Sequence, residues 1–179
     1  MKGAEINLTN TENFGNIINY QNAGNYEFNS ISEINGNDIV LLNRILNEYD
    51  VEFSVQIIKV PIYENLTVNN TISCEFWNGS IGGVCAIEVV GSIILNEDIN
   101  VSGKGFRGAQ TENQYSAYGS ISYFYHLSES QGARKGEGIF KAELDSQYEC
   151  GKGSTANGGG GGNGHNRGGG VALIIQMAG

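Results

Sequence analysis

Residues 156 to 170 read Ala-Asn-Gly-Gly-Gly-Gly-Gly-Asn-Gly-His-Asn-Arg-Gly-Gly-Gly, a tract in which side chains almost disappear. No conventional hydrophobic core can form there, because glycine has no side chain to bury. Glycine also loses more conformational freedom on folding than any other residue. The tract is therefore either disordered or held by hydrogen bonds between closely approaching backbones. In the second case the main chain itself is the packing surface.

The composition of the whole chain favours strands and turns. Among its 179 residues are 27 glycines and one proline, and the charged fraction is 16%. A typical soluble domain has roughly 25% charged residues. The remaining polarity comes largely from Asn, Ser and Gly, which suit turns better than long solvated helices. The length is sufficient for one domain with one principal core.

The charge balance narrows the choice of partners. A net charge of -9 and a pI near 4.6 exclude nucleic acid as a partner, because affinity for phosphate backbones depends on clustered Lys and Arg. An acidic surface would suit calcium or polar glycans, although the sequence requires no cofactor. No apolar run approaches the roughly 20 residues that cross a bilayer, so no direct membrane span is expected.

Hydrophobic periodicity predicts a series of short strands. With the one exception of Asn70, apolar and polar residues alternate from Leu66 to Cys74, which is the pattern of a strand buried on one face. The run from Val84 to Leu95 is more apolar and is broken by Gly91. Residues 53–60 are rich in β-branched side chains, and Pro61 should end that strand or place it at an edge.

The first fifty residues are harder to assign. Residues 7–25 scatter single aromatic and aliphatic side chains among Asn, Thr and Gly, which is typical of loops and short strands. The run Ile39 to Leu42 is short enough for a buried strand, which we favour. Its apolar residues also fall at helical spacing behind a possible N-cap at Asp38.

Together these patterns predict an all-β fold. Strands separated by Asn-containing turns, with little room for crossover helices, favour a right-handed parallel β-helix, a solenoid of stacked coils, with a glycine-rich C-terminal segment. A β-sandwich of two antiparallel sheets fits the periodicity nearly as well. In the solenoid interpretation, residues 1–50 form an N-terminal strand and loop cap, 51–150 the β-helical core and 151–179 the glycine-rich segment.

Four tyrosines form the candidate ligand-binding site. Tyr115, Tyr118, Tyr123 and Tyr125 lie close together in the sequence among Ser and Gly. Aromatic side chains at this density can stack on the flat faces of sugars, and we predict a ligand-binding role for them. The alternative interpretation is that they cover a small core.

The three cysteines are too few for a disulfide framework and lack the paired spacing of a zinc site. A disulfide between Cys74 and Cys85 would close a short loop and contribute on the order of 3 kcal/mol. Two reduced, half-buried thiols are the alternative. Cys150 is expected to be free, and no metal ligands are predicted.

The candidate catalytic motifs lack the surrounding sequence that their chemistry requires. Residues 103–108 match the dinucleotide pattern G-x-G-x-x-G, but the residues that follow have no apolar stripe for the helix that pyrophosphate binding requires. On a strand, Glu143 and Asp145 would share a face and could serve glycosidic chemistry. Solvated surface acids are the more common outcome of such a spacing. We therefore predict no catalytic residues.

Six segments, taken together, resemble a recurrent glycine-rich region of large bacterial cell-surface proteins. They are residues 55–61, 77–79, 82–84, 101–108, 135–139 and 157–170. Proteins with this region look like adhesins, often exported by type IX secretion and sometimes associated with gliding motility. The resemblance implies a parallel β-helix-like module at the bacterial cell surface, in contact with other segments of the same long protein.

We therefore expect a non-enzymatic extracellular module for adhesion or scaffolding in a larger bacterial protein. Weak contacts of Asn, Ser and exposed Tyr with a surface glycan or another cell-surface polymer would gain affinity by repetition. A β-helical carbohydrate-active enzyme is the first alternative and requires several carboxylates in one groove. Its candidates are Glu88, Glu97, Asp98 and Glu143. A structural filament or phage-tip subunit is the second alternative.

Overall fold

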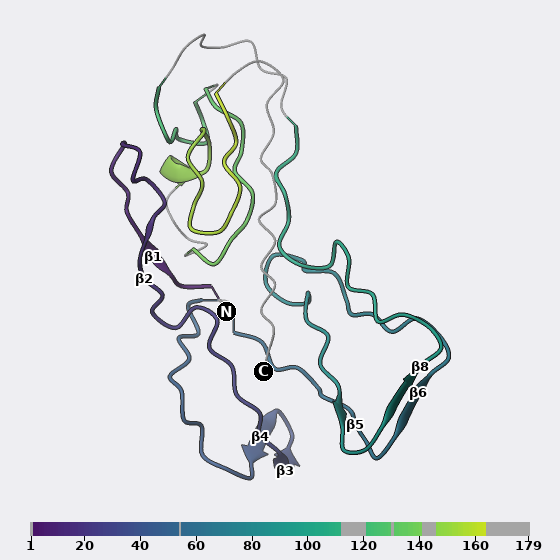
Figure 1. Cartoon of the computed structure of the whole chain (residues 1–179). Helices are drawn as coiled ribbons and strands as arrows, with labels where there is room; N and C mark the ends of the chain where they lie inside the picture. Colours follow the sequence, from purple (N-terminus) through teal and green to yellow (C-terminus); the bar gives the residue numbers. More distant parts are fainter. Residues whose placement is uncertain (1, 54, 112–120, 130, 141–145, 164–179) are drawn as a thin grey trace.

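The fold is all-β with short strands. The computed structural model of the 179-residue chain describes residues 2–53, 55–111, 121–129, 131–140 and 146–163. These residues contain eight strands and one 3-10 helix, η1 (Ser146–Tyr148), but no α-helix and no closed barrel (Figure 1). The strands associate in four separate pairs, two antiparallel and two parallel.

The N-terminal strand pairs are antiparallel. β1 (Glu5–Ile6) pairs with β2 (Ile17–Asn19), and β3 (Ile31–Asn35) forms a hairpin with β4 (Asp38–Leu41). Gly36 supplies the positive φ of 63° that a two-residue hairpin turn favours. The strand predicted for the run from Ile39 is confirmed over the extent of β4, but Ile39 and Val40 are exposed, so it is not the buried strand that was expected. The helical alternative is wrong, because this run pairs with β3 through its backbone.

Two segments of the middle region run parallel. β5 (Ile62–Tyr63) pairs with β7 (Glu88–Val89), and β6 (Leu66–Val68) pairs with β8 (Ile93–Leu95). We call residues 61–77 the first ladder segment and residues 88–104 the second ladder segment. Backbone bonds join them from one end, where Glu88 donates to the Pro61 carbonyl, to the other, where Trp77 donates to the Lys104 carbonyl.

Side chains bond along the same register. The Asn96 amide donates to the Asn69 Oδ1 atom at 2.8 Å, 27 positions away, and Ser92 donates to the Asn65 Oδ1 atom at 2.9 Å over the same separation. The Ser73 hydroxyl donates to the Asn100 carbonyl at 2.7 Å, again 27 positions away. Parallel pairing excludes the antiparallel sandwich for this region, and the break expected at Gly91 is where β7 and β8 are separated.

Two strand predictions need correction. The predicted strand from Leu66 to Cys74 shrinks to β6 and one isolated bridge at Ile72, because Asn70 interrupts the alternation and the chain turns there. The strand predicted over residues 53–60 is wrong for the described residues 55–60. Gln56 bonds to the Gly82 backbone through its side-chain amide, at 2.9 and 3.2 Å, where a strand would use its main chain.

The aromatic core joins residues distant in sequence. The ring of Phe14 lies 5.2 Å from that of Phe124, which in turn lies 4.8 Å from Tyr148. Among the described residues, the buried hydrophobic ones are Ala4, Ile6, Phe14, Val68, Trp77, Tyr125, Ala133 and Cys150. Most of them belong to the N-terminal segment and to residues 121–163, which lie side by side in Figure 1. Residues 55–111 contribute two of them, Val68 and Trp77.

Main-chain contacts hold the described part of the glycine tract. Gly136 donates to the Gly159 carbonyl at 2.8 Å, Gly161 to the Gly151 carbonyl at 2.8 Å and Ala133 to the Gly162 carbonyl at 3.1 Å. A Cβ atom added at Gly161 would overlap the Ala133 carbonyl. Of the two alternatives set out for the tract, backbone packing is therefore the one found for residues 158–162.

Candidate functional site

The best-organised polar centre of the described residues is the carboxylate of Glu137. Its Oε1 atom accepts from Arg107 Nη2 at 2.6 Å and from Arg107 Nε at 3.2 Å. Its Oε2 atom accepts from the Arg107 backbone N–H at 2.9 Å and from Trp77 Nε1 at 2.8 Å. We call these residues, with Lys2, the Glu137 clamp.

Local sequence explains how the clamp is assembled. The first ladder segment ends at Trp77, which hydrogen-bonds to the second ladder segment at Lys104, three residues before Arg107. Glycine leaves room for the guanidinium, because a Cβ atom at Gly79 would stand 2.7 Å from Arg107 Nη2. The backbone also joins Glu137 to this point through a 2.9 Å bond from its N–H to the Arg107 carbonyl.

Lys2 brings the N-terminus to the same centre. Its Nζ atom lies 3.9 Å from Glu137 Oε1 and within 5.6 Å of the ring centroids of Trp77 and Phe106, and the residue is buried. The backbone N–H groups of Gly3 and Ala4 both donate to the Ile139 carbonyl. The clamp therefore fastens the N-terminus, the two ladder segments and the segment that leads into the glycine-rich part.

The charged groups of the Glu137 clamp shift one another's pKa values. Burial alone would raise the pKa of Glu137, but the hydrogen bonds from Arg107 and the positive charges of Lys2 and Arg107 outweigh it, so this pKa lies below its usual value. The bond to Glu137 raises the pKa of Arg107. Burial lowers the pKa of Lys2, although Glu137 opposes that shift.

The geometry gives the clamp a structural role. Both oxygens of Glu137 are already occupied by two donors each, so the carboxylate presents no open position to a substrate or a cation. Its low pKa keeps it ionised near neutral pH, which is unsuited to a general acid. A charged, fully bonded carboxylate instead fixes the positions of the groups that donate to it.

The predicted tyrosine site is only partly assembled. Tyr115 and Tyr118 lie outside the described residues. Tyr125 is buried, so its ring forms part of the core, as in the alternative interpretation, and is not available to stack on a sugar. Tyr123 is half-buried, and the Lys152 ammonium lies over its ring at 4.2 Å. A ligand-binding role thus remains a prediction, with Tyr123 the one described residue that is not buried.

The two candidate disulfide cysteines are half-buried free thiols that lie near one another. Cys74 and Cys85 both line an open hollow of about 1050 Å³. Burial raises the pKa of the Cys85 thiol, and the proximity of Cys74 raises it further. The disulfide between them stays a prediction. Cys150 is buried, and its backbone exchanges hydrogen bonds with Tyr125.

The acids proposed for an enzyme are distributed along the second ladder segment. Glu88 lies on β7, whereas Glu97 and Asp98 follow β8, and Glu143 and Asp145 lie outside the described residues. Within the described part of the chain, no three His, Cys, Asp or Glu side chains gather as a metal ion would require. The dinucleotide-like residues 103–108 form a loop, and residues 109–111, the described residues directly after it, are not helical.

Comparisons of the chain with protein-family models, with curated proteins and with solved structures each found no match. Among the described residues, no helix has the length and apolar character that crossing a membrane requires.

Glu137 was not among the predicted site residues. No sequence pattern singled it out, although three of the six segments of the resemblance, at residues 77–79, 101–108 and 135–139, contain Trp77, Arg107 and Glu137. The structure brings these three side chains into direct contact. Charge alone gave no indication, since Glu137 is one of 19 acidic residues in the chain.

A second buried cation lies in the aromatic core. The Nζ atom of Lys135 lies over the Phe14 ring at 4.0 Å and has no hydrogen-bond partner among the described residues. Burial lowers the pKa of Lys135 from about 10.5 to about 7, and the nearby Cys150 opposes that shift only in part. The aromatic face supplies part of the stabilisation that a polar partner would give.

We predict that the buried amine makes folding stability depend on pH. Because the folded-state pKa of Lys135 lies below its unfolded value, the unfolded chain binds more protons between about pH 7 and pH 10, and stability from this group rises with pH across that range. The Lys135→Met variant should be more stable than the native protein at pH 6, by on the order of 1 kcal/mol. Urea unfolding at pH 6, 8 and 9.5 tests this, and an advantage of the variant that does not shrink with rising pH would contradict it.

Proposed function

We propose that this chain is a non-enzymatic extracellular module for adhesion or scaffolding in a larger bacterial protein, built on a right-handed parallel β-helix. The observation that carries the proposal is the parallel stacking of the two ladder segments, with partners 26 positions apart between β5 and β7 and 27 positions apart from Leu66 onward. Leu66 pairs with Ile93, Val68 with Leu95 and Ile72 with Ile99. We interpret these segments as consecutive coils of a solenoid.

The polar ladder favours a rigid scaffold. Asn65, Asn69 and Ser73 each bond to the residue stacked on them 27 positions later, so every coil adds side-chain bonds to its backbone bonds. In a solenoid each unit contacts only its neighbours, so coils can be added without a change in the existing ones. Such a body can extend a binding surface away from a cell.

The Glu137 clamp supports the same proposal. It ties the ends of both ladder segments to the N-terminus and to Glu137, which leads into the glycine-rich segment. A module under mechanical load benefits from such a junction, because charge-assisted hydrogen bonds are stronger than neutral ones. The resemblance to glycine-rich regions of bacterial cell-surface proteins supports the extracellular location.

Surface chemistry favours attachment to a polar polymer. Lysine ammonium groups cover the rings of Phe76 at 3.5 Å and Tyr123 at 4.2 Å, so these aromatic faces are partly occupied. Exposed Asn and Ser side chains along the ladder then provide the larger contact surface, with weak contacts that repetition strengthens.

Affinity electrophoresis in gels cast with acidic or neutral polysaccharides tests the attachment role. We expect retarded migration without release of reducing ends, and the same gels run with a chelator show whether calcium contributes. New reducing ends that disappear in Glu88→Gln or Glu97→Gln variants would assign the chain to the carbohydrate-active enzymes. If no polymer retards the protein, the adhesion role is contradicted and scaffolding is the proposed role that is left.

A further inference from the structure

The stacked apolar side chains of the two ladder segments differ in their solvent exposure. Val68 of the first segment is 2% exposed, whereas Leu95, which stacks on it, is 58% exposed. Leu66 and Ile72 are half-buried, and their partners Ile93 and Ile99 are exposed. The same side-chain positions are thus covered in one segment and uncovered in the next, and among the described residues the outer side of the second segment is an unoccupied apolar face.

The outer edges also present unpaired backbone groups. Leu66 donates its N–H to the Ser92 carbonyl, and the Val68 carbonyl accepts from Asn96, so these two residues turn their backbone toward the second segment. Successive residues of a strand turn alternately to opposite sides. Thr67 therefore faces the outer edge of the first segment, and Ile93 and Leu95 face that of the second.

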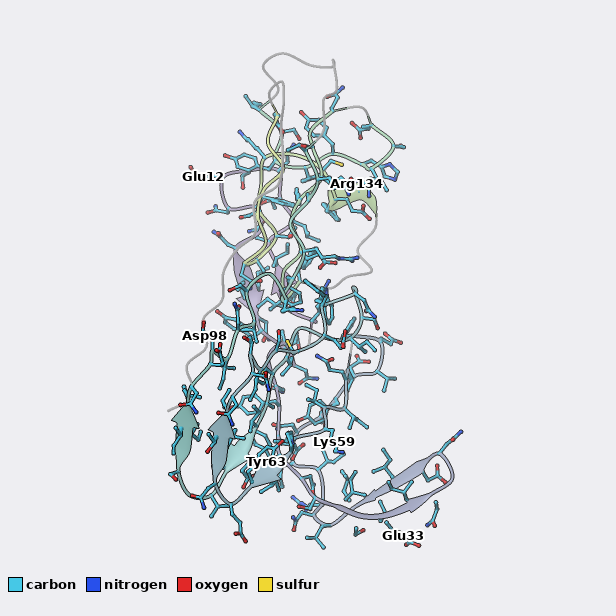
Figure 2. The ribbon with its side chains drawn as sticks, turned by 90° about the vertical axis from the view of Figure 1, so that its right-hand side faces the viewer. Glu12, Glu33, Lys59, Tyr63, Asp98 and Arg134 are labelled. Carbon is cyan, nitrogen blue, oxygen red and sulfur yellow. The ribbon has the colours of Figure 1, made fainter. Side chains whose placement is uncertain are left out.

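These edges are free in the described part of the chain. β5 and β6 pair only with β7 and β8 there. Figure 2 shows β8 and β6 side by side, with β8 and Asp98 on the side away from the β3–β4 hairpin that Glu33 marks. A free strand edge presents unpaired N–H and C=O groups with which a further strand can pair.

The charged residues of the second ladder segment would not repel another first ladder segment that stacked on its outer side. Glu88 pairs with Ile62. Glu97 and Asp98 lie between Asn96 and Ile99, which are stacked on Asn69 and Ile72, so they stand over Asn70 and Thr71. A further first ladder segment placed on the second would bring uncharged residues opposite all three acids, and like charges directly opposite one another would be avoided.

We propose that the outer face of the second ladder segment binds the first ladder segment of a second copy of this chain, as a third parallel layer. The inference rests on the solenoid interpretation of the proposed function. Asn69 of the incoming copy would lie on Asn96, which repeats the bond already present between them within one chain. The contact is head-to-tail and does not close, so copies add in a row.

Paired edge-blocking variants test the inference. The Leu95→Pro variant removes an outward N–H from the second segment, and Thr67→Pro does so on the first, while both leave the bonds between the segments in place. Analytical ultracentrifugation at about 0.5 M salt, where repulsion between the acidic copies is screened, measures the association. Ile18→Lys, at an exposed apolar residue of β2, is the matched control for Leu95→Lys.

We expect the average mass of the native protein and of Ile18→Lys to rise with concentration above 19.2 kDa. Leu95→Pro, Leu95→Lys and Thr67→Pro alone should stay monomeric, and an equimolar mixture of the two proline variants should give dimers and nothing larger. A native protein that stays monomeric at every concentration, or proline variants that associate alone, would overturn the inference.

Hydrogen exchange separates this outcome from a failure of the proposed architecture. The amides of Val90 and Asn96 donate to the first ladder segment, at Tyr63 and Val68. If these amides are protected while the protein stays monomeric, the solenoid interpretation holds, and only the proposed binding of a second copy is wrong. If they exchange at the rate of an unfolded chain, both proposals fail.

Discussion

Replacing Gly161 with alanine should lower the free energy of unfolding by about 3 kcal/mol or more, because overpacking in a tight contact reaches or exceeds that size. The added Cβ atom would overlap the Ala133 carbonyl and approach that of Arg134. Both groups are backbone, so no side chain can rotate away to make room. The overlap can be removed only if the glycine tract moves away from Ala133. That movement would break the hydrogen bond from Gly161 to the Gly151 carbonyl.

Thermal unfolding checks this prediction, with an expected drop in Tm of roughly 6 to 12 °C for a chain of this length. Gly105→Ala is the matched control, because a Cβ atom there meets nothing within 4 Å. It should change stability by no more than about 1 kcal/mol. Equal effects of the two substitutions would mean that close backbone packing does not decide the cost at Gly161.

Removing the carboxylate of Glu137 should have the second largest effect. Breaking a buried ion pair costs about 3 to 5 kcal/mol. The Glu137 side chain is 20% exposed and that of Arg107 is 57% exposed, so solvent screens part of the interaction. We therefore expect Glu137→Ala to lose about 2 to 3 kcal/mol, most of it because the part-buried Trp77 Nε1 loses its acceptor and the buried Lys2 loses its counter-ion. Urea unfolding at pH 7 measures it.

The pH dependence identifies the charge as the cause. Because the folded-state pKa of Glu137 is depressed, its stabilisation is fully present above the unfolded value of about 4.3 and is lost as the pH falls through the folded value. The difference between native protein and Glu137→Ala should therefore narrow in acid. Glu33→Ala, at an exposed residue of β3, should change stability little at any pH. A Glu137 effect that stays constant down to pH 2 would contradict the charge-based explanation.

Local patterns in the sequence were sufficient to predict several strands and the all-β class. The alternation at Leu66 to Val68, the break at Gly91 and the short run from Ile39 each correspond to an observed strand or strand boundary. These signals are local, since side-chain period and turn residues act within a few positions. The fold class therefore followed from the sequence.

Such local patterns could not predict the packing between segments that are distant in the sequence. A β-branched run predicted a strand at residues 55–60, where the Gln56 side chain instead bonds to the Gly82 backbone. Glu137 lies 30 positions from Arg107 and 60 from Trp77, and no local spacing relates three residues at such separations. Only the contact geometry shows that a glycine-flanked glutamate is the centre of the polar network.

The central claim is that main-chain hydrogen bonds order the described glycine-rich segment, and amide hydrogen exchange tests it most directly. The amides of Gly136, Gly151, Gly153 and Gly161 donate to carbonyls at 2.8 to 2.9 Å. We predict that all four exchange far more slowly than in an unfolded chain, and that Gly161→Ala abolishes the protection at Gly161 and Gly136. Exchange of these amides in the native protein at unfolded-chain rates would contradict the claim.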